Sequence, residues 1–588
     1  MGKMKELCAS LAAAFVVIVM VLGCPQTEYI DPEIRISPNT AIVPVGETYS
    51  FDASISGIPS AYQSLVWLIV EGGTHSDTYV IDGVLRVAID EKRESFTVRA
   101  ALEADPAVFG EATVSVQAGD PEVLAVEVAP PEFNMASGVT GSVQFMGNVI
   151  GIHSPPRTLT WSIVETGTHS DTGIVGGLLT VSSAETLTRL TVRAISTFDP
   201  DVWGEAVVYV DPAPSDLLVV ASGVQHTVAI ASDGSLWAWG NNEHGRTGLS
   251  VSDGNTAAPT RIGRDGGWVY VSAGEEHTMA IREDGSLWAW GNNANGRTGL
   301  ETTGGITLSP TRVGEDNNWR SVSAGTQHTM AIRTDNTLWA TGNVANGRTG
   351  LLNQNVTGSI SSFMQSVSGW GPGLTGTEWL SVSAGDQHTM GIRTDGTLWA
   401  TGNVADGRTG LLNANVVGTI SSFTQSVSGW GPGLTGTEWL SVSAGTLHSA
   451  GIMADGTLWA WGNNSNGRTG LGTTTGQANS PTQIGLDDNW KSVSAADQHS
   501  AGIRADGTLW AWGNNADGRT GLGTTADSQS DPAQVGLADT WAFVSAGAQH
   551  GMAIASDGTL WAWGNNADGR TGLGTTAGSQ NTPVRLGR

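Results

Sequence analysis

Histidine and arginine recur at regular intervals in the C-terminal two-thirds of the chain, and both residue types can bind ligands or take part in catalysis. Neighbouring histidines of the repeat stand 51 or 60 residues apart. Equivalent imidazoles of a regular repeat lie too far apart to share one metal ion, so we expect each histidine to fill a strand position bonded to backbone. These residues are His226, His277, His328, His388, His448, His499 and His550.

The recurring arginines stand in turns that contain Gly-Arg-Thr-Gly-Leu. If equivalent turns emerge on one side of a repeat array, their charges form a ring that can hold an anionic ligand or an acidic partner. The alternative, which we favour, is that each arginine pairs with a local acid, as Asp517 precedes Arg519 and Asp568 precedes Arg570. The candidates are Arg246, Arg297, Arg348, Arg408, Arg468, Arg519 and Arg570.

No other constellation in the chain predicts catalysis. The sequence has no nucleophilic cysteine, no serine elbow, no phosphate-binding loop and no recurring pair of carboxylates. His75 stands near Asp77 and His169 near Asp171. Two donors in one turn are too few for a metal site, and we interpret both as polar turns. We therefore expect no enzyme activity, no cofactor and no metal.

Composition limits the class of protein. The chain has 588 residues, 39% of them hydrophobic, with 80 glycines and 23 tryptophans, so we expect several folded domains rich in tight turns. The net charge of −27, without a basic run, argues against nucleic-acid binding. It favours solubility through self-repulsion, and we expect a monomer.

The N-terminus has the pattern of an export signal. Lys3 and Lys5 precede an apolar run over residues 11–22, which is too short to span a bilayer. The run ends in Val-Leu-Gly-Cys24, which resembles the lipobox of bacterial lipoproteins. That resemblance implies a signal peptide over 1–23, an acylated Cys24 with a tether over 24–32, and anchoring in the cell envelope. The alternative is an ordinary signal peptide.

Two further details bear on the compartment. Cys8 would leave with the signal peptide, so the mature chain would keep Cys24 alone and form no disulfide. Pro25 follows the cysteine, where an aspartate would resemble an inner-membrane retention signal. We therefore expect the outer membrane.

Residues 33–117 and 122–211 are a diverged pair. Thr-His-Ser-Asp-Thr begins at Thr74 and again at Thr168, and each unit has one tryptophan in a matching strand, Trp67 and Trp161. Short alternating strands with Gly and Asp turns predict β-sandwiches. The pattern resembles the bacterial Ig-like domains of surface proteins, which implies a spacer role.

Residues 216–588 repeat one motif seven times, with a period of about fifty residues that is typical of propeller blades. In each repeat a short strand reaches Asp-Gly or, once, Asp-Asn, and a second strand follows, as around Asp284 and Gly285. We expect a two-residue hairpin turn there, with positive φ at both residues. The predicted fold class is all-β, a seven-bladed propeller preceded by two sandwich domains.

The repeat resembles the RCC1 (regulator of chromosome condensation) family through Gly-x-x-His-Thr, Asp-Gly-x-Leu-Trp-x-Trp-Gly and Gly-x-x-Gly-Leu. The family usually has Gln-Leu where this chain has Arg-Thr. The first repeat lacks the leading tryptophan, and the chain ends just after Pro583-Val584-Arg585-Leu586-Gly587. We therefore expect the last strand to complete the blade that the first strand begins, which would protect the sheet edges.

The third and fourth repeats carry extra residues, and these inserts are our candidate partner-binding loops, since aromatic side chains dominate the energetics of interfaces. We hypothesise a binding or adhesion module that recognises a protein or glycan. One alternative is an envelope enzyme inhibitor like RCC1-type β-lactamase inhibitors, and another, opposed by the export signal, is a guanine-nucleotide exchange factor. The candidate contact residues are Phe363, Trp370, Trp379, Phe423, Trp430 and Trp439.

Overall fold

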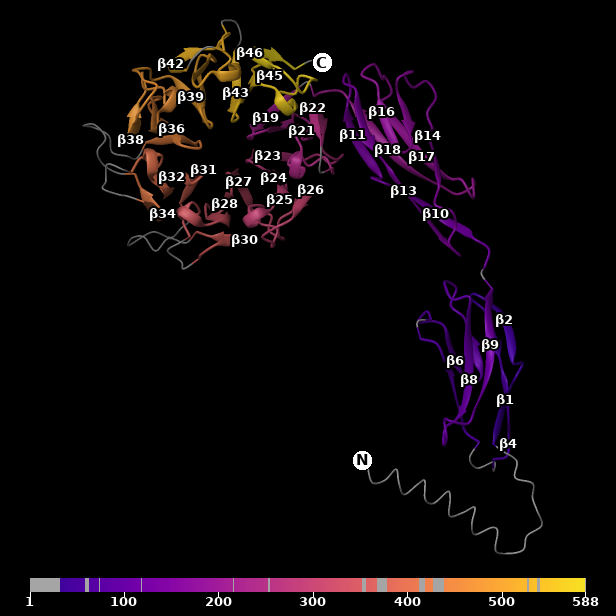
Figure 1. Ribbon diagram of the computed structural model, residues 1–588. Coiled ribbons are helices and arrows are strands. Elements are labelled where there is room, and N and C mark those ends of the chain that lie inside the picture. Colours follow the sequence, from indigo (N-terminus) through magenta and orange to yellow (C-terminus); the bar gives the residue numbers. More distant parts are fainter. Residues whose placement is uncertain are drawn as a thin grey trace, which may run out of the picture. The chain divides into compact units, whose positions relative to one another are not determined.

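The computed structural model of this protein shows an all-β chain (Figure 1). The predicted signal peptide and Cys24 lie outside the residues that it describes. These are residues 32–58, 63–72, 74–117, 119–214, 216–251, 254–351, 356–366, 378–411, 418–426, 438–525, 528–536 and 540–586.

The first sandwich repeat folds around one apolar cluster. Its strands are β1 (Glu33–Ser37), β2 (Thr40–Pro44), β3 (Thr48–Ser50), β4 (Asp52–Ser56), β5 (Leu65–Ile69), β6 (Tyr79–Ile81), β7 (Val84–Arg86), β8 (Ser95–Leu102) and β9 (Phe109–Gln117). They form sheets of order β2-β9-β8-β5, β3-β7-β6 and β1-β4. Leu85, Val98 and Val114 are fully buried in the cluster, and Trp67 packs against it. Alternation of apolar and polar residues thus directs one side of each strand inward.

The second sandwich repeat has the same strand pairing. Its strands are β10 (Glu122–Ala129), β11 (Glu132–Ala136), β12 (Gly141–Gln144), β13 (Met146–Ile152), β14 (Leu159–Ile163), β15 (Gly173–Val175), β16 (Leu178–Val181), β17 (Arg189–Ser196) and β18 (Trp203–Asp211). The sheets β11-β18-β17-β14, β12-β16-β15 and β10-β13 match those of the first repeat one by one. β2–β9 and β11–β18 are both parallel pairs. The likeness of the two sequences therefore extends to topology.

The two His-Ser-Asp segments are polar turns. The Glu91 carboxylate accepts the backbone N–H of His75 at 2.8 Å, and Glu185 accepts that of His169 at 3.0 Å. The Nδ1 atom of His75 in turn accepts the N–H of Asp77. Within the part of the chain that the structure describes, no group of three or more His, Cys, Asp or Glu side chains is placed to hold a metal ion. These side chains therefore stabilise turns.

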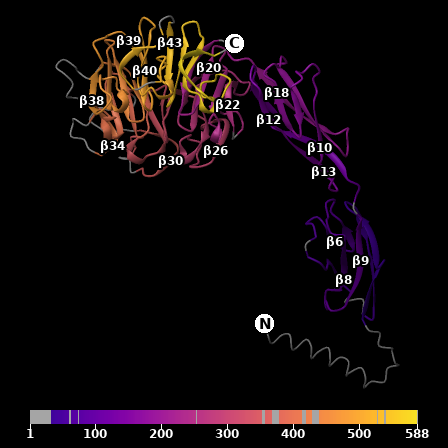
Figure 2. The same ribbon diagram turned by 45° about the horizontal axis from the view of Figure 1, so that its top comes forward.

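The C-terminal region is a ring of seven four-stranded antiparallel sheets, each made of four consecutive strands (Figures 1 and 2). The first three blades are β19 (Leu217–Ser222), β20 (His226–Ala231), β21 (Leu236–Asn241), β22 (Asn255–Arg261); β23 (Trp268–Ala273), β24 (His277–Arg282), β25 (Leu287–Asn292), β26 (Ile306–Arg312); and β27 (Trp319–Ala324), β28 (His328–Arg333), β29 (Leu338–Asn343), β30 (Ser359–Gln365).

The remaining blades repeat this plan. They are β31 (Trp379–Ala384), β32 (His388–Arg393), β33 (Leu398–Asn403), β34 (Thr419–Gln425); β35 (Trp439–Ala444), β36 (His448–Met453), β37 (Leu458–Asn463), β38 (Gln477–Gln483); β39 (Trp490–Ala495), β40 (His499–Arg504), β41 (Leu509–Gly513), β42 (Gln529–Gln534); and β43 (Trp541–Ala546), β44 (His550–Ala555), β45 (Leu560–Asn565), β46 (Ser579–Arg585).

A short 3-10 turn follows the third strand of each blade. The seven turns are η2 (Glu243–Gly245), η3 (Ala294–Gly296), η4 (Ala345–Gly347), η6 (Ala405–Gly407), η8 (Ser465–Gly467), η9 (Ala516–Gly518) and η10 (Ala567–Gly569).

The ends of the ring do not share a blade, so the expected closure by a final strand is wrong. β46 pairs with β45, and β19 pairs with β20, each within its own sheet. The seventh and first blades are joined by side chains: the Ser222 N–H donates to Ser545 Oγ at 2.9 Å, and Trp239 Nε1 donates to the Arg570 carbonyl at 3.1 Å. The pattern of one repeat is complete within four strands, so no strand is left over to be exchanged.

The Asp-Gly turns also differ from the two-residue turn that we predicted. In the second blade Ile281 pairs with Leu287, and the N–H of Gly285 donates to the Arg282 carbonyl at 2.9 Å. Gly285 has φ +78°, whereas Asp284 is not among the residues with positive φ. The Asp284 carboxylate instead accepts the backbone N–H and the hydroxyl of Ser286. The aspartate is therefore favoured at its position because it accepts these two hydrogen bonds, and the glycine is favoured because it adopts a positive φ without strain.

A second glycine in each blade is required by close backbone approach, and this generates a prediction. Gly291 has φ +98°, and a Cβ there would lie 2.5 Å from the Glu276 carbonyl oxygen. Gly305 has a similar φ of +94° with open space around it. We expect Gly305→Ala to lower the free energy of unfolding by about 1–3 kcal/mol through backbone strain. Gly291→Ala should lower it by roughly 1–3 kcal/mol more through overlap.

Urea unfolding of the full chain, followed by tryptophan fluorescence, measures the two losses. Equal losses for Gly291→Ala and Gly305→Ala would show that the backbone contact at Gly291 relaxes without cost.

Candidate binding surfaces of the propeller

The seven histidines join neighbouring blades. All are at most 1% exposed. In six blades the Nε2 atom lies 2.8–3.0 Å from a threonine or serine hydroxyl of the next blade. That hydroxyl donates to the backbone carbonyl of the arginine in the histidine's own blade, as Thr278 does to Arg246 at 2.9 Å. Because the hydroxyl has one hydrogen, Nε2–H is the donor to its oxygen.

This arrangement corrects our expectation that each histidine bonds to backbone directly. A hydroxyl of the next blade lies between the ring and the carbonyl. His499 is the exception, since Gly551 stands where the other blades have a hydroxyl, and its Nε2 has no hydrogen-bond partner. Burial lowers the pKa of all seven rings, to about 3 for His226, His388 and His499. The rings are therefore neutral and committed to the fold.

The arginines also join blades. Their side chains are buried, with residues only 2–4% exposed. In every blade Nη1 donates to a backbone carbonyl of the next blade, at 2.8 Å from Arg468 to Asp497 and at 3.5 Å from Arg570 to Val224. Asp406, Asp517 and Asp568 pair with the arginines two residues later. The guanidinium groups therefore stabilise turns and blade junctions, and the proposed open ring for an anionic ligand is not formed.

Three of the four candidate aromatic contacts that the structure describes are core residues. Trp379 and Trp439 are each 1% exposed and Phe423 2%. Phe363, which is half-buried, lies 5.0 Å from Trp319 between ring centroids. Trp379, Trp439 and Phe423 offer no surface to a partner, so the prediction is wrong for them, because the strand that each belongs to directs it into the blade. Trp370 and Trp430 lie outside the described residues.

Sequence reasoning missed a set of arginine–tryptophan stacks. Arg282 lies between Trp268 and Trp288, with its Cζ atom 4.5 and 4.6 Å from the ring centroids. Equivalent stacks fill the third, fourth and sixth blades, around Arg333, Arg393 and Arg504. The sequence feature that could have revealed these stacks is the arginine that ends the second strand of each of these blades. In the first blade Leu217 and Ala231 replace the leading tryptophan and the arginine.

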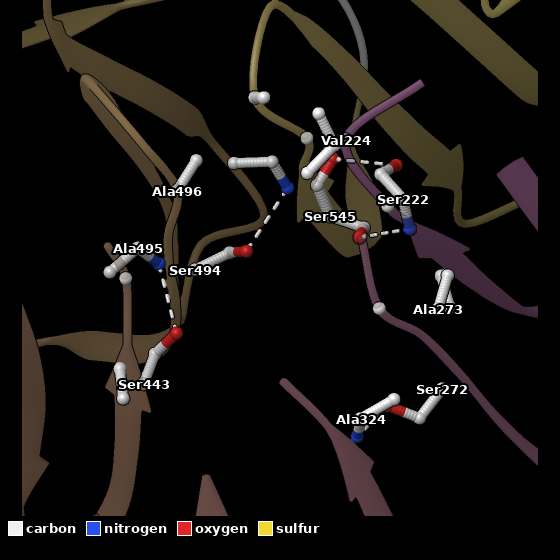
Figure 3. Close-up of a pocket in the computed structure, with 18 of the residues that line it drawn as sticks. Ser222, Val224, Ser272, Ala273, Ala324, Ser443, Ser494, Ala495, Ala496 and Ser545 are labelled. Atoms are coloured by element: carbon white, nitrogen blue, oxygen red, sulfur yellow. Dashed lines mark hydrogen bonds between the residues drawn. The ribbon is translucent and has the colours of Figure 1, made fainter. Parts of the chain in front are cut away.

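A channel of about 500 Å³ lies inside the ring, lined by the first strands of the blades (Figure 3). Six serine hydroxyls of these first strands each accept a backbone N–H from the next blade at 2.9–3.0 Å, as Ser443 does from Ala495. Ala221 takes the serine position in the first blade. The small side chains thus let seven strands approach the axis.

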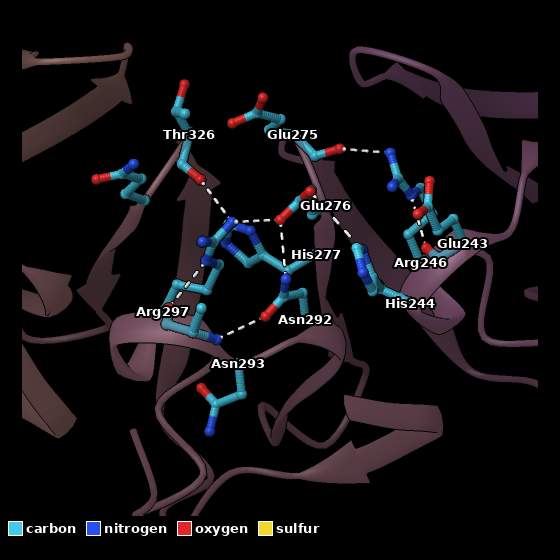
Figure 4. A network of polar contacts seen from close by, with 12 residues as sticks. Glu243, His244, Arg246, Glu275, Glu276, His277, Asn292, Asn293, Arg297 and Thr326 are labelled. Carbon is cyan, nitrogen blue, oxygen red and sulfur yellow. Dashed lines mark hydrogen bonds and ion pairs between the residues drawn. The ribbon is translucent and has the colours of Figure 1, made fainter. Parts of the chain in front are cut away.

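One mouth of the channel is acidic. Glu275, Asp386 and Asp497 are among its lining residues, which include no lysine or arginine. Burial, and repulsion by Glu276 and Asp386, raise the pKa of Glu275. In the adjoining network Glu276 accepts from Asn292 Nδ2 at 2.9 Å and from Arg297 Nη1 at 3.3 Å (Figure 4). This mouth therefore disfavours an anionic ligand.

The buried histidines generate a pH prediction. Their folded pKa values lie below the ordinary value of 6.5. The unfolded chain therefore binds more protons below pH 6.5, and stability that is present above pH 6.5 is lost as the pH falls toward the folded pKa values. Each histidine should contribute up to about 1.4 kcal/mol per pH unit. Urea midpoints measured from pH 7.5 to pH 5.0 test this.

Two variants isolate the propeller's share of that dependence. His277→Asn should reduce the slope of the propeller's unfolding free energy against pH, because about one proton fewer is taken up on unfolding. His75→Asn in the first sandwich repeat should leave that slope unchanged. A slope that is the same in wild type and in His277→Asn would contradict the assignment.

Comparison with protein families identifies the repeat. A model described as the regulator of chromosome condensation (RCC1) repeat matches seven segments, and a second model of that description matches four longer ones. The seven segments are residues 219–246, 268–297, 319–348, 379–407, 439–468, 490–519 and 541–570. The four are residues 233–281, 284–332, 455–503 and 506–554.

Curated relatives align over the same region. The ultraviolet-B receptor UVR8 of Arabidopsis thaliana is 26% identical over 368 residues, which cover 61% of this chain and 80% of the relative. The regulator of chromosome condensation of Xenopus laevis is 25% identical over 351 residues, covering 57% and 81%.

Solved structures show the likeness in fold. Human WBSCR16 superposes with a TM-score of 0.52 at 21% identity, over 60% of this chain and 95% of that chain. Yeast RCC1 (Prp20), in a complex with Kap60, has a TM-score of 0.51 at 18% identity, over 64% and 85%. Over residues 219–570 this chain therefore belongs to the RCC1 repeat family, with the β-propeller fold of that family.

Proposed function

We propose that this chain is a cell-envelope lipoprotein whose propeller, carried on two Ig-like spacers, binds a protein or glycan partner. RCC1-like repeat proteins typically mediate protein binding or act as exchange factors. The residues of this propeller best suited to chemistry, its histidines and arginines, are buried between blades. A binding role therefore depends on the exposed faces rather than on a catalytic centre.

The two faces of the propeller differ in which residues they present. Within a blade the first residue of the first strand pairs with the last residue of the second, as Trp268 does with Arg282. The start of the first strand and the Asp-Gly turn thus share one face, which we call the hairpin face. The arginine turns, at the other end of the third strand, lie on the opposite face.

One observation carries the proposal: large apolar side chains are exposed at equivalent positions of four blades on the hairpin face. Leu218, Val269, Leu380 and Leu440 all occupy the second position of a first strand and are 62, 51, 45 and 58% exposed. A folded chain rarely leaves equivalent apolar residues exposed around one opening, and such patches mark interaction sites. Ser366 and Glu378, the described residues on either side of the segment that contains Trp370, bond to Leu338 and Thr394 beside the turns of this face.

The lipoprotein part of the proposal rests on the sequence around Cys24. In the described residues no helix is both long enough and apolar enough to cross a bilayer. We expect Cys24→Ser to abolish labelling of the chain by radioactive palmitate and to move it from the membrane to the soluble envelope fraction. Cys8→Ser is the matched control and should keep the label. A Cys24→Ser chain that still takes up palmitate would contradict the proposal.

The binding part is tested on intact cells. Protease should remove the propeller from the surface of cells that produce the full chain, and photo-crosslinking through the full chain should capture a partner. The Trp370→Ser/Trp430→Ser variant should capture less of it if the inserts contribute. Protection from protease, together with capture of an envelope enzyme whose activity falls, would favour the inhibitor alternative. No specific capture would overturn the binding role.

A further inference from the structure

The first and second blades meet through apolar side chains. Ile230 of the first blade packs against Trp268 and Val271 of the second in one buried cluster. Leu218 and Val269, each the second residue of a first strand, lie outside this cluster and are exposed.

A groove of about 410 Å³ lies between the two blades on the hairpin face. Its apolar lining residues come from both blades. They are Leu218, Val219, Ile230 and Ala231 of the first blade, and Trp268 and Val269 of the second.

The apolar surface extends beyond the groove to the channel. Leu218 and Val269, on the lips of the groove, are more than half exposed, at 62 and 51%. Val219 lines both the groove and the channel. Tyr270 and Phe543, each 38% exposed, line the channel in the blades on either side of the first. The patch is therefore continuous across three blades and has two aromatic side chains.

Negative charge lies beside this apolar surface. Asp233 and Glu283 line the groove, and no lysine or arginine does. Asp233 accepts two hydrogen bonds from Ser235, which lower the pKa of its carboxyl and keep it ionised. Glu283 is exposed and projects from the second blade. The neighbouring cation Arg282 is already paired with Asp265 at 2.9 Å.

Resting on the binding function proposed above, we infer that this groove binds a protein segment in which a large apolar side chain stands next to a lysine or arginine. The apolar side chain would pack between Leu218 and Val269, where burial of apolar surface supplies the affinity. The basic group would reach Glu283, and its aliphatic stem would cover the groove wall. An acidic segment would be repelled by Asp233 and Glu283 as well as by the chain's net charge of −27.

The test uses the full chain in detergent and four fluorescein-labelled peptides of one length. One peptide carries Leu-Phe beside Lys-Arg, a second has Gln-Gln for the basic pair, a third has Ser-Ser for the apolar pair, and the fourth has Glu-Glu for the basic pair. Fluorescence anisotropy gives each Kd. We expect the first peptide to bind at least tenfold more tightly than the other three.

Variants locate the site. Leu218→Ser/Val269→Ser should weaken binding of the basic apolar peptide at least tenfold, and Glu283→Gln at least threefold. Glu283→Lys should reverse the preference, so that the Glu-Glu peptide binds better than the Lys-Arg peptide. The matched control is Ile306→Ser/Leu486→Ser, which changes two exposed apolar side chains outside the groove and should leave Kd unchanged. All four side chains are exposed, and thermal unfolding checks that each variant is folded.

Three results would overturn the inference: no binding of the basic apolar peptide, equal binding of the Gln-Gln peptide, or equal weakening by the control variant. Its failure is separable from that of the proposed function. A cell-surface partner captured equally by wild type and Leu218→Ser/Val269→Ser would keep the binding function and remove the groove as its site.

Discussion

Every blade of this propeller must satisfy polar groups that it buries against the next blade. A four-stranded blade cannot bury its own faces, so the seven blades are stable only when packed together. Each junction encloses an imidazole, a guanidinium group and several backbone carbonyls, and six of the seven also enclose a hydroxyl. A buried polar group without a partner costs about 1–3 kcal/mol. The chain of contacts from histidine to hydroxyl to carbonyl, with the arginine bonded across the same junction, satisfies most of them.

This constraint explains why the most regular residues are unavailable for binding. The histidines and arginines recur because each junction needs one of each, and the small residues of the first strands recur because seven strands approach one axis. Binding must then depend on residues that the junctions do not use. These include the exposed second positions of the first strands, such as Leu218 and Val269.

The junctions themselves are not all equal. Gly551 supplies no hydroxyl to His499, and Ala221 supplies none to the inner wall of the first blade. In the first case a Cβ at position 551 would lie 2.3 Å from the Trp563 ring, so the tryptophan occupies the space that a threonine would need. The ring tolerates such losses because each junction has several hydrogen bonds and an apolar cluster, such as that of Leu217, Val220 and Trp239 with Met552 and Ile554.

The sequence alone was sufficient for the features that depend on neighbours along the chain. Alternation of apolar and polar residues located the strands, and the period near fifty residues predicted seven blades that the strand pairing shows. Likewise, the recurrence of Trp67 and Trp161 within matching strands predicted two repeats of like topology. Strand formation and turn position are local properties, so periodic patterns report them.

Only the tertiary structure decided which side chains meet across a junction. His226 contacts Thr278, more than fifty residues away, and Arg246 donates to the Glu275 carbonyl, a partner that no side-chain pattern indicates. A tryptophan can lie in a core or on an exposed loop, so residue type alone could not show that Trp379 is buried. The groove between the first two blades is lined by residues of both, and a groove becomes visible only when the atoms around it have positions.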